Sequence, residues 1–321
     1  MGIEEIRLEG LDPRKFIRRK VREIASAVGN GLAVNALSGG VDSSTVTLLA
    51  HMALGSRLNT YFIENGIMRE DEAEKVVSLF KGLGVPVKLI DAKEEFFSAL
   101  KGVTDPEEKR EAIARTFYRD VFGKLVRESG ARFLLQGTIL TDVDETVAGI
   151  KRQHNVFEQL GIDPQKVYGY GIIEPLVQLR KPAVREVAKA LGLPEDVWNR
   201  PPFPGPALAA RLIGEVTPER VETARKATKI VEEELHGTGA FQYMAILHND
   251  RVTGMRNGKR DFGLQVEVRC WDSSDAVTGK PTRLPHEKLE RLAWRITTEV
   301  PGVVSVTYSV TAKPPSTIEA V

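Results

Sequence analysis

The stretch SGGVDSS, residues 38–44, is the part of the sequence whose residue types point most directly to chemistry. It follows the apolar run GLAVNAL at residues 31–37, which is typical of a short buried strand. A glycine-rich turn between a strand and a helix leaves backbone N–H groups open and aims the helix N-terminus at its ligand. The stretch therefore predicts a phosphate-binding loop, made of Ser38, Gly39, Gly40, Val41, Asp42, Ser43 and Ser44.

Asp42 adds a metal ion to this prediction. A carboxylate inside an anion-binding loop would repel a phosphate unless Mg²⁺ lay between it and the phosphate oxygens. The loop has neither the lysine of a Walker A motif nor the G-x-G-x-x-G spacing of dinucleotide-binding enzymes. Serine and aspartate are also common helix caps, so a shorter match would be explained by capping alone. The seven residues together favour a phosphate site with Asp42 as the ligand of Mg²⁺.

The elements around the loop alternate between helix and strand as far as about residue 200. This alternation predicts an α/β fold with a doubly wound parallel sheet. The expected helices are 14–28, 46–52, 70–84, 106–129 and 182–192, and the expected strands are 31–37, 58–65, 85–91 and 131–138.

A proline-rich stretch, NRPPFPGP at residues 199–206, marks the expected domain boundary, because rigid, proline-rich segments are typical of the connections between domains. We therefore expect an α/β domain over residues 1–200 and a smaller C-terminal α+β domain over residues 201–321. In the second domain we expect helices at 217–236 and 286–300, and strands at 241–247, 264–270 and 303–310.

Composition narrows the possible functions. The 321 residues carry 45 Lys and Arg against 44 Asp and Glu, so a broad basic surface for nucleic acid or for an anionic membrane is not expected. The chain has one cysteine, Cys270, which excludes an internal disulfide and a site with several thiolates. The sequence shows no signal peptide and no apolar run of membrane-spanning length. We expect a cytoplasmic protein.

SGGVDSS resembles the pyrophosphate loop of the ATP pyrophosphatases, which bind the leaving diphosphate of ATP while AMP is transferred to an oxygen of the substrate. This resemblance implies ATP and Mg²⁺ as cofactors and an adenine nucleotide alpha hydrolase-like fold. By itself it leaves the acceptor open among GMP, NAD, argininosuccinate and asparagine synthetases and tRNA-thiolating enzymes. The neutral charge and single cysteine disfavour the last of these.

Further stretches resemble the ATP pyrophosphatase part of the GMP synthetases, and the C-terminal KPPSTIE, residues 313–319, is the most specific of them. The others are ENGIMREDEAEKV (64–76), LKGVTDPEEKREAI (100–113), QGTILTDVDET (136–146) and RPPFPGPALAARLIGEVTPE (200–219). The resemblance implies a ligase of GMP and purine biosynthesis. ATP would adenylylate the 2-oxygen of xanthosine monophosphate (XMP), and ammonia would displace AMP to give GMP.

In this family ammonia comes from a glutaminase with a nucleophilic cysteine, and residues 1–37 contain no cysteine. The resemblance therefore implies a separate glutamine amidotransferase subunit as partner, and a homodimer formed through the C-terminal domain. Two alternatives stay open: a relative that adenylylates another acceptor, and a catalytically impaired paralogue that only binds ATP.

The resemblance also assigns site residues. It implies catalytic roles for Asp42, Lys151, His154 and Asp142, and XMP binding by Arg110, Gln242, Lys313, Ile318 and Glu319. Several have an ordinary alternative: the acids of TDVDET could cap a helix, Arg110 and its neighbour Lys109 could lie on a solvated helix face, Gln242 could be a surface residue beside a strand, and a chain terminus is often frayed.

The sequence departs from the family at several positions. Gln153 and the pair Phe157-Glu158 alter the lid over the ATP site, Ala207 replaces a glycine, and Ser305 replaces an arginine that contacts the nucleotide phosphate. These departures fall on lid and substrate positions while the phosphate loop is intact. The intact loop therefore supports ATP binding, whereas the departures concern specificity for XMP.

Overall fold

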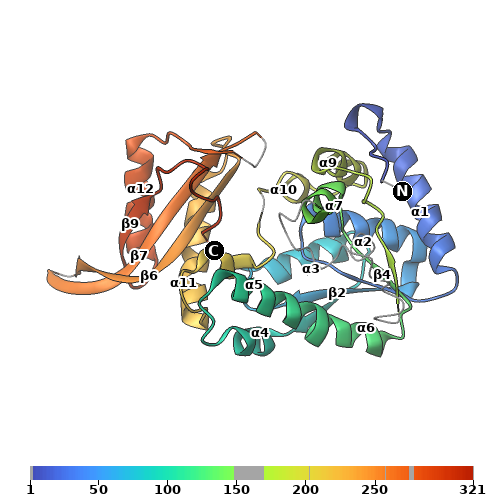
Figure 1. The fold of residues 1–321 in the computed structure, drawn as a ribbon, viewed down its shortest axis with the longest axis horizontal. Helices are drawn as coiled ribbons and strands as arrows, with labels where there is room; N and C mark the ends of the chain where they lie inside the picture. Colours follow the sequence, from blue (N-terminus) through green and yellow to red (C-terminus); the bar gives the residue numbers. More distant parts are fainter. Residues whose placement is uncertain (1–2, 148–169, 202, 257, 275–277, 321) are drawn as a thin grey trace. The chain divides into compact units, whose positions relative to one another are not determined.

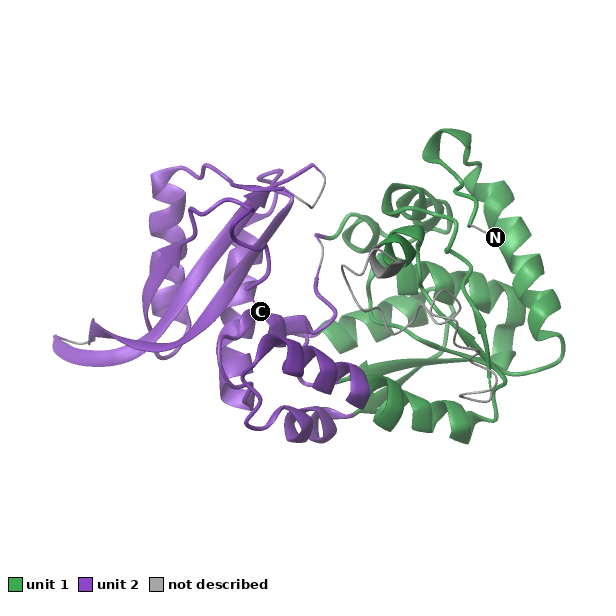
Figure 2. Ribbon diagram, viewed as in Figure 1, with its two compact units in different colours: residues 1–64, 72–91, 117–200 green, residues 65–71, 92–116, 201–321 purple. Residues whose placement is uncertain are grey.

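The computed structural model describes residues 3–147, 170–201, 203–256, 258–274 and 278–320 (Figure 1). These residues form two compact units (Figure 2). Residues 1–64, 72–91 and 117–200 make up the first unit, and residues 65–71, 92–116 and 201–321 the second. The second unit thus includes two segments that precede residue 200 in the chain. Lys151, His154, Gln153, Phe157 and Glu158 lie outside the described residues.

The first unit is built on a parallel sheet, which confirms the predicted fold class. Its described residues form five strands in the order β3-β2-β1-β4-β5, and every neighbouring pair is parallel. The strands are β1 (Ala33–Ala36), β2 (Leu58–Glu64), β3 (Val87–Asp91), β4 (Phe133–Leu135) and β5 (Gly171–Ile173). The order reverses direction on either side of β1, so the loop after β1 lies at a switch point, where α/β sheets bind ligands.

Helices flank this sheet. They are α1 (Pro13–Val28), α2 (Val41–Leu54), α3 (Glu72–Gly82), α6 (Gly123–Ser129), α7 (Leu140–Val147), α9 (Lys181–Ala190) and α10 (Glu195–Trp198), with short 3₁₀ turns at Leu8–Gly10 and Gly55–Arg57. α1, α2 and α9 pack against one another, and α3 packs on β2 and β3. α1 begins where Asp12 accepts a hydrogen bond from the Lys15 N–H at 3.0 Å, with Pro13 at the first helical position.

The expected helix at 106–129 is observed with an interruption. It consists of α5 (Pro106–Arg115), a π-helical segment η3 (Thr116–Phe122) and α6. β5 was not predicted, because three residues are too short to show a strand period. The helix α4 (Lys93–Leu100) was not predicted either, although it buries Phe96 and Leu100 at helical spacing.

The second unit combines a mixed sheet with helices, which agrees with the expected α+β class. β6 (Gln242–Arg256) and β7 (Lys259–Asp272) form a long antiparallel hairpin, and β7 also pairs with β8 (Lys280–Pro281) and, in parallel, with β9 (Val303–Tyr308). The remaining helices are α11 (Pro218–Leu235), α12 (His286–Glu299) and the 3₁₀ turn η5 (Ala207–Arg211). α11 packs on β6 and α12 packs on β9. No helix among the described residues is long and apolar enough to cross a membrane.

Candidate functional site

The predicted phosphate loop connects β1 to α2 and is held by its own serines. The Oγ atoms of Ser38 and Ser43 lie 2.9 Å apart, and the Ser43 hydroxyl also donates to the Gly40 carbonyl at 3.1 Å. Gly40 precedes the first residue of α2, and no side chain of the described residues caps this helix. The open N–H groups of the first turn are therefore available for an anionic ligand.

A buried polar chain fixes this helix terminus against the sheet. Thr60 on β2 donates to Oδ1 of Asn35 on β1 at 2.8 Å, and Nδ2 of Asn35 contacts the Thr47 hydroxyl at 2.5 Å. Thr47 in turn donates to the Ser43 carbonyl at 2.8 Å. Because buried polar groups are costly to leave unpaired, this chain fixes α2 in one position relative to β1 and β2.

Gly39 is required for two reasons. Its φ of +79° favours glycine, and a Cβ atom there would lie 2.7 Å from Cγ2 of Val76 and 3.0 Å from Oε1 of Glu72. Glu72 itself is buried and forms a bidentate pair with Arg200, with both N–O distances at 2.5 Å. The loop thus packs directly on α3, whose acidic residue is neutralised by an arginine 128 residues away in the sequence.

Asp42 in the first turn of α2 is the acidic group of the loop. Its Oδ2 accepts a hydrogen bond from Nζ of Lys181 at 2.5 Å, whereas its buried Oδ1 has no hydrogen-bond partner among the described residues. The described residues contain no group of three or more His, Cys, Asp or Glu side chains that could hold a metal ion. The unpaired Oδ1 of Asp42 is an oxygen ligand of the kind that Mg²⁺ takes together with phosphate oxygens and water.

The segment that follows β4 closes the other side of the loop. A Cβ atom on Gly137 would lie 3.2 Å from both the Asp42 carbonyl carbon and the Ser43 nitrogen, so this segment and the start of α2 are in close contact. Gln136 beside it is buried, and its Oε1 atom has no hydrogen-bond partner among the described residues. An orphaned acceptor next to the loop is the kind of group that binds a ligand N–H or a metal-bound water.

Asp142 takes part in the start of α7. Its Oδ2 accepts a hydrogen bond from the Ile139 N–H at 3.0 Å, which is the capping role that the sequence allowed. The neighbouring Asp144 pairs with Arg180 at 2.7 Å. A catalytic role for Asp142 stays a prediction.

In the second unit, the C-terminal segment docks on the sheet. Ile318 packs with Met244, Ile246 and Trp271 in one buried cluster. Next to it, Oε1 of Glu319 accepts a hydrogen bond from Nε2 of Gln242 at 2.7 Å. Three of the five residues expected to bind XMP are therefore brought together by β6 and the tail.

Two further groups hold the tail in place. Nη1 of Arg269 on β7 donates to the carbonyls of Thr317 and Ile318 at 2.9 and 3.2 Å. The Lys313 and Gly279 backbones exchange hydrogen bonds at 2.9 and 3.1 Å. The tail is consequently an ordered element, and the frayed-terminus alternative does not apply to residues 313–320.

Arg110 and Lys109 differ in exposure. The Arg110 side chain is half exposed and pairs with Glu107 at 2.7 Å. Lys109 is buried, and its Nζ donates to the Leu212 carbonyl at 2.7 Å. Burial, together with the charge of Arg220, lowers the pKa of Lys109 to about 8. Lys109 thus connects two segments of the second unit through a buried hydrogen bond. The interpretation of it as a solvated helix residue is wrong.

Two of the positions at which the sequence departs from the family lie among the described residues. Ala207 adopts a φ of +53°, in the left-handed region that favours the glycine of the family. Ser305 lies on β9 opposite Gln265 of β7.

Four basic side chains that pair with residues of the phosphate loop, of α3 or of the tail were not predicted as site residues from the sequence. They are Lys181, Arg200, Arg211 and Arg269, and each acts on a partner far away in the chain. Local spacing offers no reason to choose them. A signal for two of them is their place in the RPPFPGPALAAR motif.

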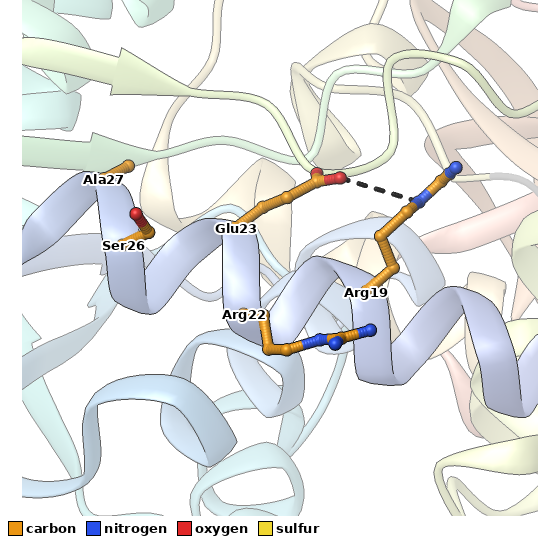
Figure 3. Close-up of a pocket in the computed structure, with 5 residues that line it drawn as sticks. All are labelled: Arg19, Arg22, Glu23, Ser26 and Ala27. Atoms are coloured by element: carbon orange, nitrogen blue, oxygen red, sulfur yellow. Dashed lines mark ion pairs between the residues drawn. The ribbon is translucent and has the colours of Figure 1, made fainter.

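A shallow depression on the exposed side of α1 holds none of the predicted site residues. Arg19, Arg22, Glu23, Ser26 and Ala27 line it, and Arg19 pairs with Glu23 at 3.6 Å (Figure 3). A single-helix surface of this kind does not enclose a small ligand, so the loop and the tail remain the candidate sites.

Comparisons with known proteins cover both units. Residues 229–320 match the family model described as the GMP synthase C terminal domain, and residues 12–122 match the model described as NAD synthase. The chain is 48% identical over 309 residues to the subunit designated B of GMP synthase (glutamine-hydrolyzing) from Archaeoglobus fulgidus, covering 96% of this chain and 99% of that protein. It is 47% identical over 312 residues to the protein of the same name from Pyrococcus horikoshii, again covering 96% and 99%. The similarity thus extends from before the phosphate loop into the tail.

Proposed function

The chain belongs to the family of these GMP synthase (glutamine-hydrolyzing) subunits, and from this membership we propose how its two units divide the reaction. It is a ligase that uses ATP to form a carbon–nitrogen bond, making GMP from XMP. The observation that carries this function is identity near one half over nearly the whole of both chains. In the first step ATP adenylylates the 2-oxygen of XMP, and in the second ammonia displaces AMP.

The first unit binds ATP through residues 38–44. The open N–H groups at the start of α2 and the hydroxyls of Ser38 and Ser43 bind the β and γ phosphates, which leave together as pyrophosphate. The lysine paired with Asp42 adds a positive charge beside these phosphates. Stabilising the leaving group in this way lowers the barrier to attack on the α phosphate.

Mg²⁺ fits Asp42, whose orphaned Oδ1 is the observation that supports the site. When bound, the ion would neutralise charge that develops on the departing pyrophosphate. The chain's own contribution is to hold the carboxylate in place through Lys181 and the close approach of Gly137. Catalytic roles for Lys151 and His154 rest on the family pattern alone.

The second unit binds XMP through the tail and β6. Glu319 and Gln242 offer acceptors and donors to the purine edge, and Ile318 packs beside them. Lys313 and Arg110 supply positive charge for the nucleotide phosphate. This assignment is supported by the docking of the tail onto the sheet, which holds Gln242, Ile318 and Glu319 together before the nucleotide binds.

Ammonia comes from a separate glutamine amidotransferase subunit. The name of the relatives supports this division, because it designates them as one subunit of a glutamine-hydrolyzing enzyme. The chain's one cysteine is buried on β7, and burial raises the pKa of the Cys270 thiol, so it is not suited to be the glutaminase nucleophile. We also propose a homodimer formed through the second unit.

The test is product formation by the purified chain. Incubation with ATP, Mg²⁺, ammonium and XMP should give GMP, AMP and pyrophosphate in equal amounts. If AMP forms only with another acceptor, for example a deamido dinucleotide suggested by the NAD synthase match, the chain is a relative that adenylylates a different substrate. ATP binding without AMP formation would assign the catalytically impaired paralogue.

A further inference from the structure

The guanidinium of Arg211 is a buried charge that the roles above leave unexplained. Arg211 is the last residue of η5, and its side chain is 1% exposed. Its Nε and Nη1 atoms have no hydrogen-bond partner among the described residues. A buried cation is costly unless an opposite charge lies close by, so its position requires a specific partner.

That partner is the carboxylate of Glu319 in the tail. Oε2 of Glu319 lies 3.7 Å from Nε of Arg211, which is an ion-pair distance but too long for a hydrogen bond. Oε1 is already taken by Gln242 at 2.7 Å, and Oε2 is buried without a hydrogen-bond partner among the described residues. The charge of the carboxylate is therefore balanced by Arg211, and part of the Glu319 side chain, 21% of its surface, stays exposed.

An aromatic ring fixes the guanidinium. The centroid of the Phe203 ring lies 4.6 Å from Cζ of Arg211 and 3.7 Å from Cζ of Arg69. Arg69 is tied in turn to Glu232 on α11 at 2.6 Å. The cation–π contact with Phe203 stabilises the Arg211 guanidinium beside Glu319.

We infer that Arg211 is a positioning residue for XMP recognition, holding the Glu319 carboxylate ionised and oriented so that it accepts an N–H hydrogen bond from the purine. An ionised carboxylate only accepts hydrogen bonds, whereas a protonated one presents a donor to the purine N–H. The inference rests on the proposed function, in which Glu319 contacts the purine edge. It adds a residue that touches no ligand and acts through Glu319.

The charges around Glu319 support this interpretation. Burial raises the pKa of the Glu319 carboxyl, and the strongest opposing influence is the charge of Arg211, followed by the hydrogen bond from Gln242 and the charges of Arg269 and Arg110. Without the charge of Arg211, burial would therefore raise the pKa of the Glu319 carboxyl further. Glu319 would then stay protonated up to a higher pH than in the wild type.

The first test follows the Glu319 carboxyl without any nucleotide. The full chain, labelled with ¹³C at glutamate carboxyls, is titrated by NMR, and the Glu319 signal is identified by its loss in Glu319→Gln. Arg211→Met should move the Glu319 titration to higher pH by about one unit or more, and Arg211→Lys should move it less. An unchanged titration in Arg211→Met would overturn the inference.

The second test measures XMP kinetics against pH. In Arg211→Met the KM for XMP should rise about tenfold or more below neutral pH and recover as the pH increases, while kcat at saturating XMP stays within about twofold. Arg211→Lys should recover most of the affinity. Equal losses of kcat and KM at every pH would indicate a purely structural role and overturn the inference.

A second variant covers the case in which Arg211→Met does not fold. Glu319→Gln changes one tail atom, imitates the protonated carboxyl, and should raise the KM for XMP to a value that no longer depends on pH below neutral. Wild-type affinity in Glu319→Gln would overturn the inference. The matched control is Arg291→Met, which removes an exposed arginine paired with Glu234 in the same unit and should change neither measurement. If the wild-type chain binds no XMP, the proposed function fails while the carboxyl titration still decides the role of Arg211.

Discussion

Lys181 pairs with only one oxygen of the Asp42 carboxylate: its Nζ lies 2.5 Å from Oδ2, while Oδ1 has no hydrogen-bond partner among the described residues. The two residues are 139 positions apart in the chain. α9 begins at Lys181 and packs on α2, which brings the lysine to the phosphate loop. The pairing keeps the acid in place and leaves one oxygen for a cation.

The first prediction concerns this carboxylate. Asp42→Asn keeps the shape of the side chain but removes its charge, so it should lower ATP-dependent pyrophosphate release by about 100-fold or more. The measurement is pyrophosphate release at several Mg²⁺ concentrations. The control is Glu186→Gln on α9, an exposed acid paired with Lys189, which should behave as wild type. Near-normal release by Asp42→Asn would remove the metal role from this residue.

The second prediction compares two glycines of the first unit that share a positive φ. Gly39→Ala places a Cβ 2.7 Å from Val76 and should abolish detectable ATP binding by displacing the loop. Gly84 has a φ of +78°, but a Cβ added there would meet nothing within 4 Å. Gly84→Ala should therefore cost about 1 kcal/mol of stability and leave ATP affinity unchanged. Calorimetric titration with ATP separates the two, and equal affinities would show that the contact with α3 is dispensable.

The third prediction concerns the nitrogen source. The isolated chain should make GMP with ammonium and not with glutamine, because its one thiol is buried at 1% exposure and is Cys270 of β7. Cys270→Ser should leave the ammonium reaction intact. Glutamine-dependent GMP formation by the highly purified chain would contradict the division into two subunits.

The fourth prediction separates binding from folding in the tail. Lys313→Met should raise the KM for XMP by about 10- to 150-fold, the equivalent of losing a charge-assisted hydrogen bond, with ATP affinity unchanged. Ile318→Ala opens a space beside Trp271 and should instead lower the free energy of unfolding by about 2–4 kcal/mol. Thermal unfolding and XMP kinetics on both variants provide the check. An unchanged XMP dependence in Lys313→Met would exclude this lysine from the site.

The fifth prediction is a pH dependence of stability that arises from Lys109. Its pKa falls from 10.5 in the unfolded chain to about 8 in the folded one, because burial disfavours the charged form. Between these values the unfolded chain binds more protons, so this lysine makes stability rise with pH from about 8 to about 10.5 and penalises the fold below that window.

Lys109→Met removes this effect. The stability of the wild type minus that of Lys109→Met should therefore increase as the pH is raised through that window, as measured by urea unfolding at several pH values. The exposed Lys101→Met in the same unit is the control and should show a constant difference. A constant difference for Lys109→Met as well would mean that the buried amine is charged in the fold at these pH values.

Short-range features were predictable from the sequence. The phosphate loop, β1 and the helix α2 depend on seven consecutive residues and on local periodicity, and the parallel sheet follows from the alternation of helix and strand. The ordered tail could be proposed from its motif. β5 was not predicted, because it has three residues and is specified by pairing with β4.

The amino-acid sequence by itself determined the fold class, the phosphate loop and the family resemblance, since these rest on residue types at fixed spacing. Tertiary structure decided which charges meet: Asp42 with Lys181, Glu72 with Arg200, and Arg211 with Glu319. It also decided that Lys109 is buried, and that residues 92–116 belong with the C-terminal unit. The physical reason is that a pairing or a burial depends on how crossovers and packed faces bring distant segments together, and local spacing carries no information about that arrangement.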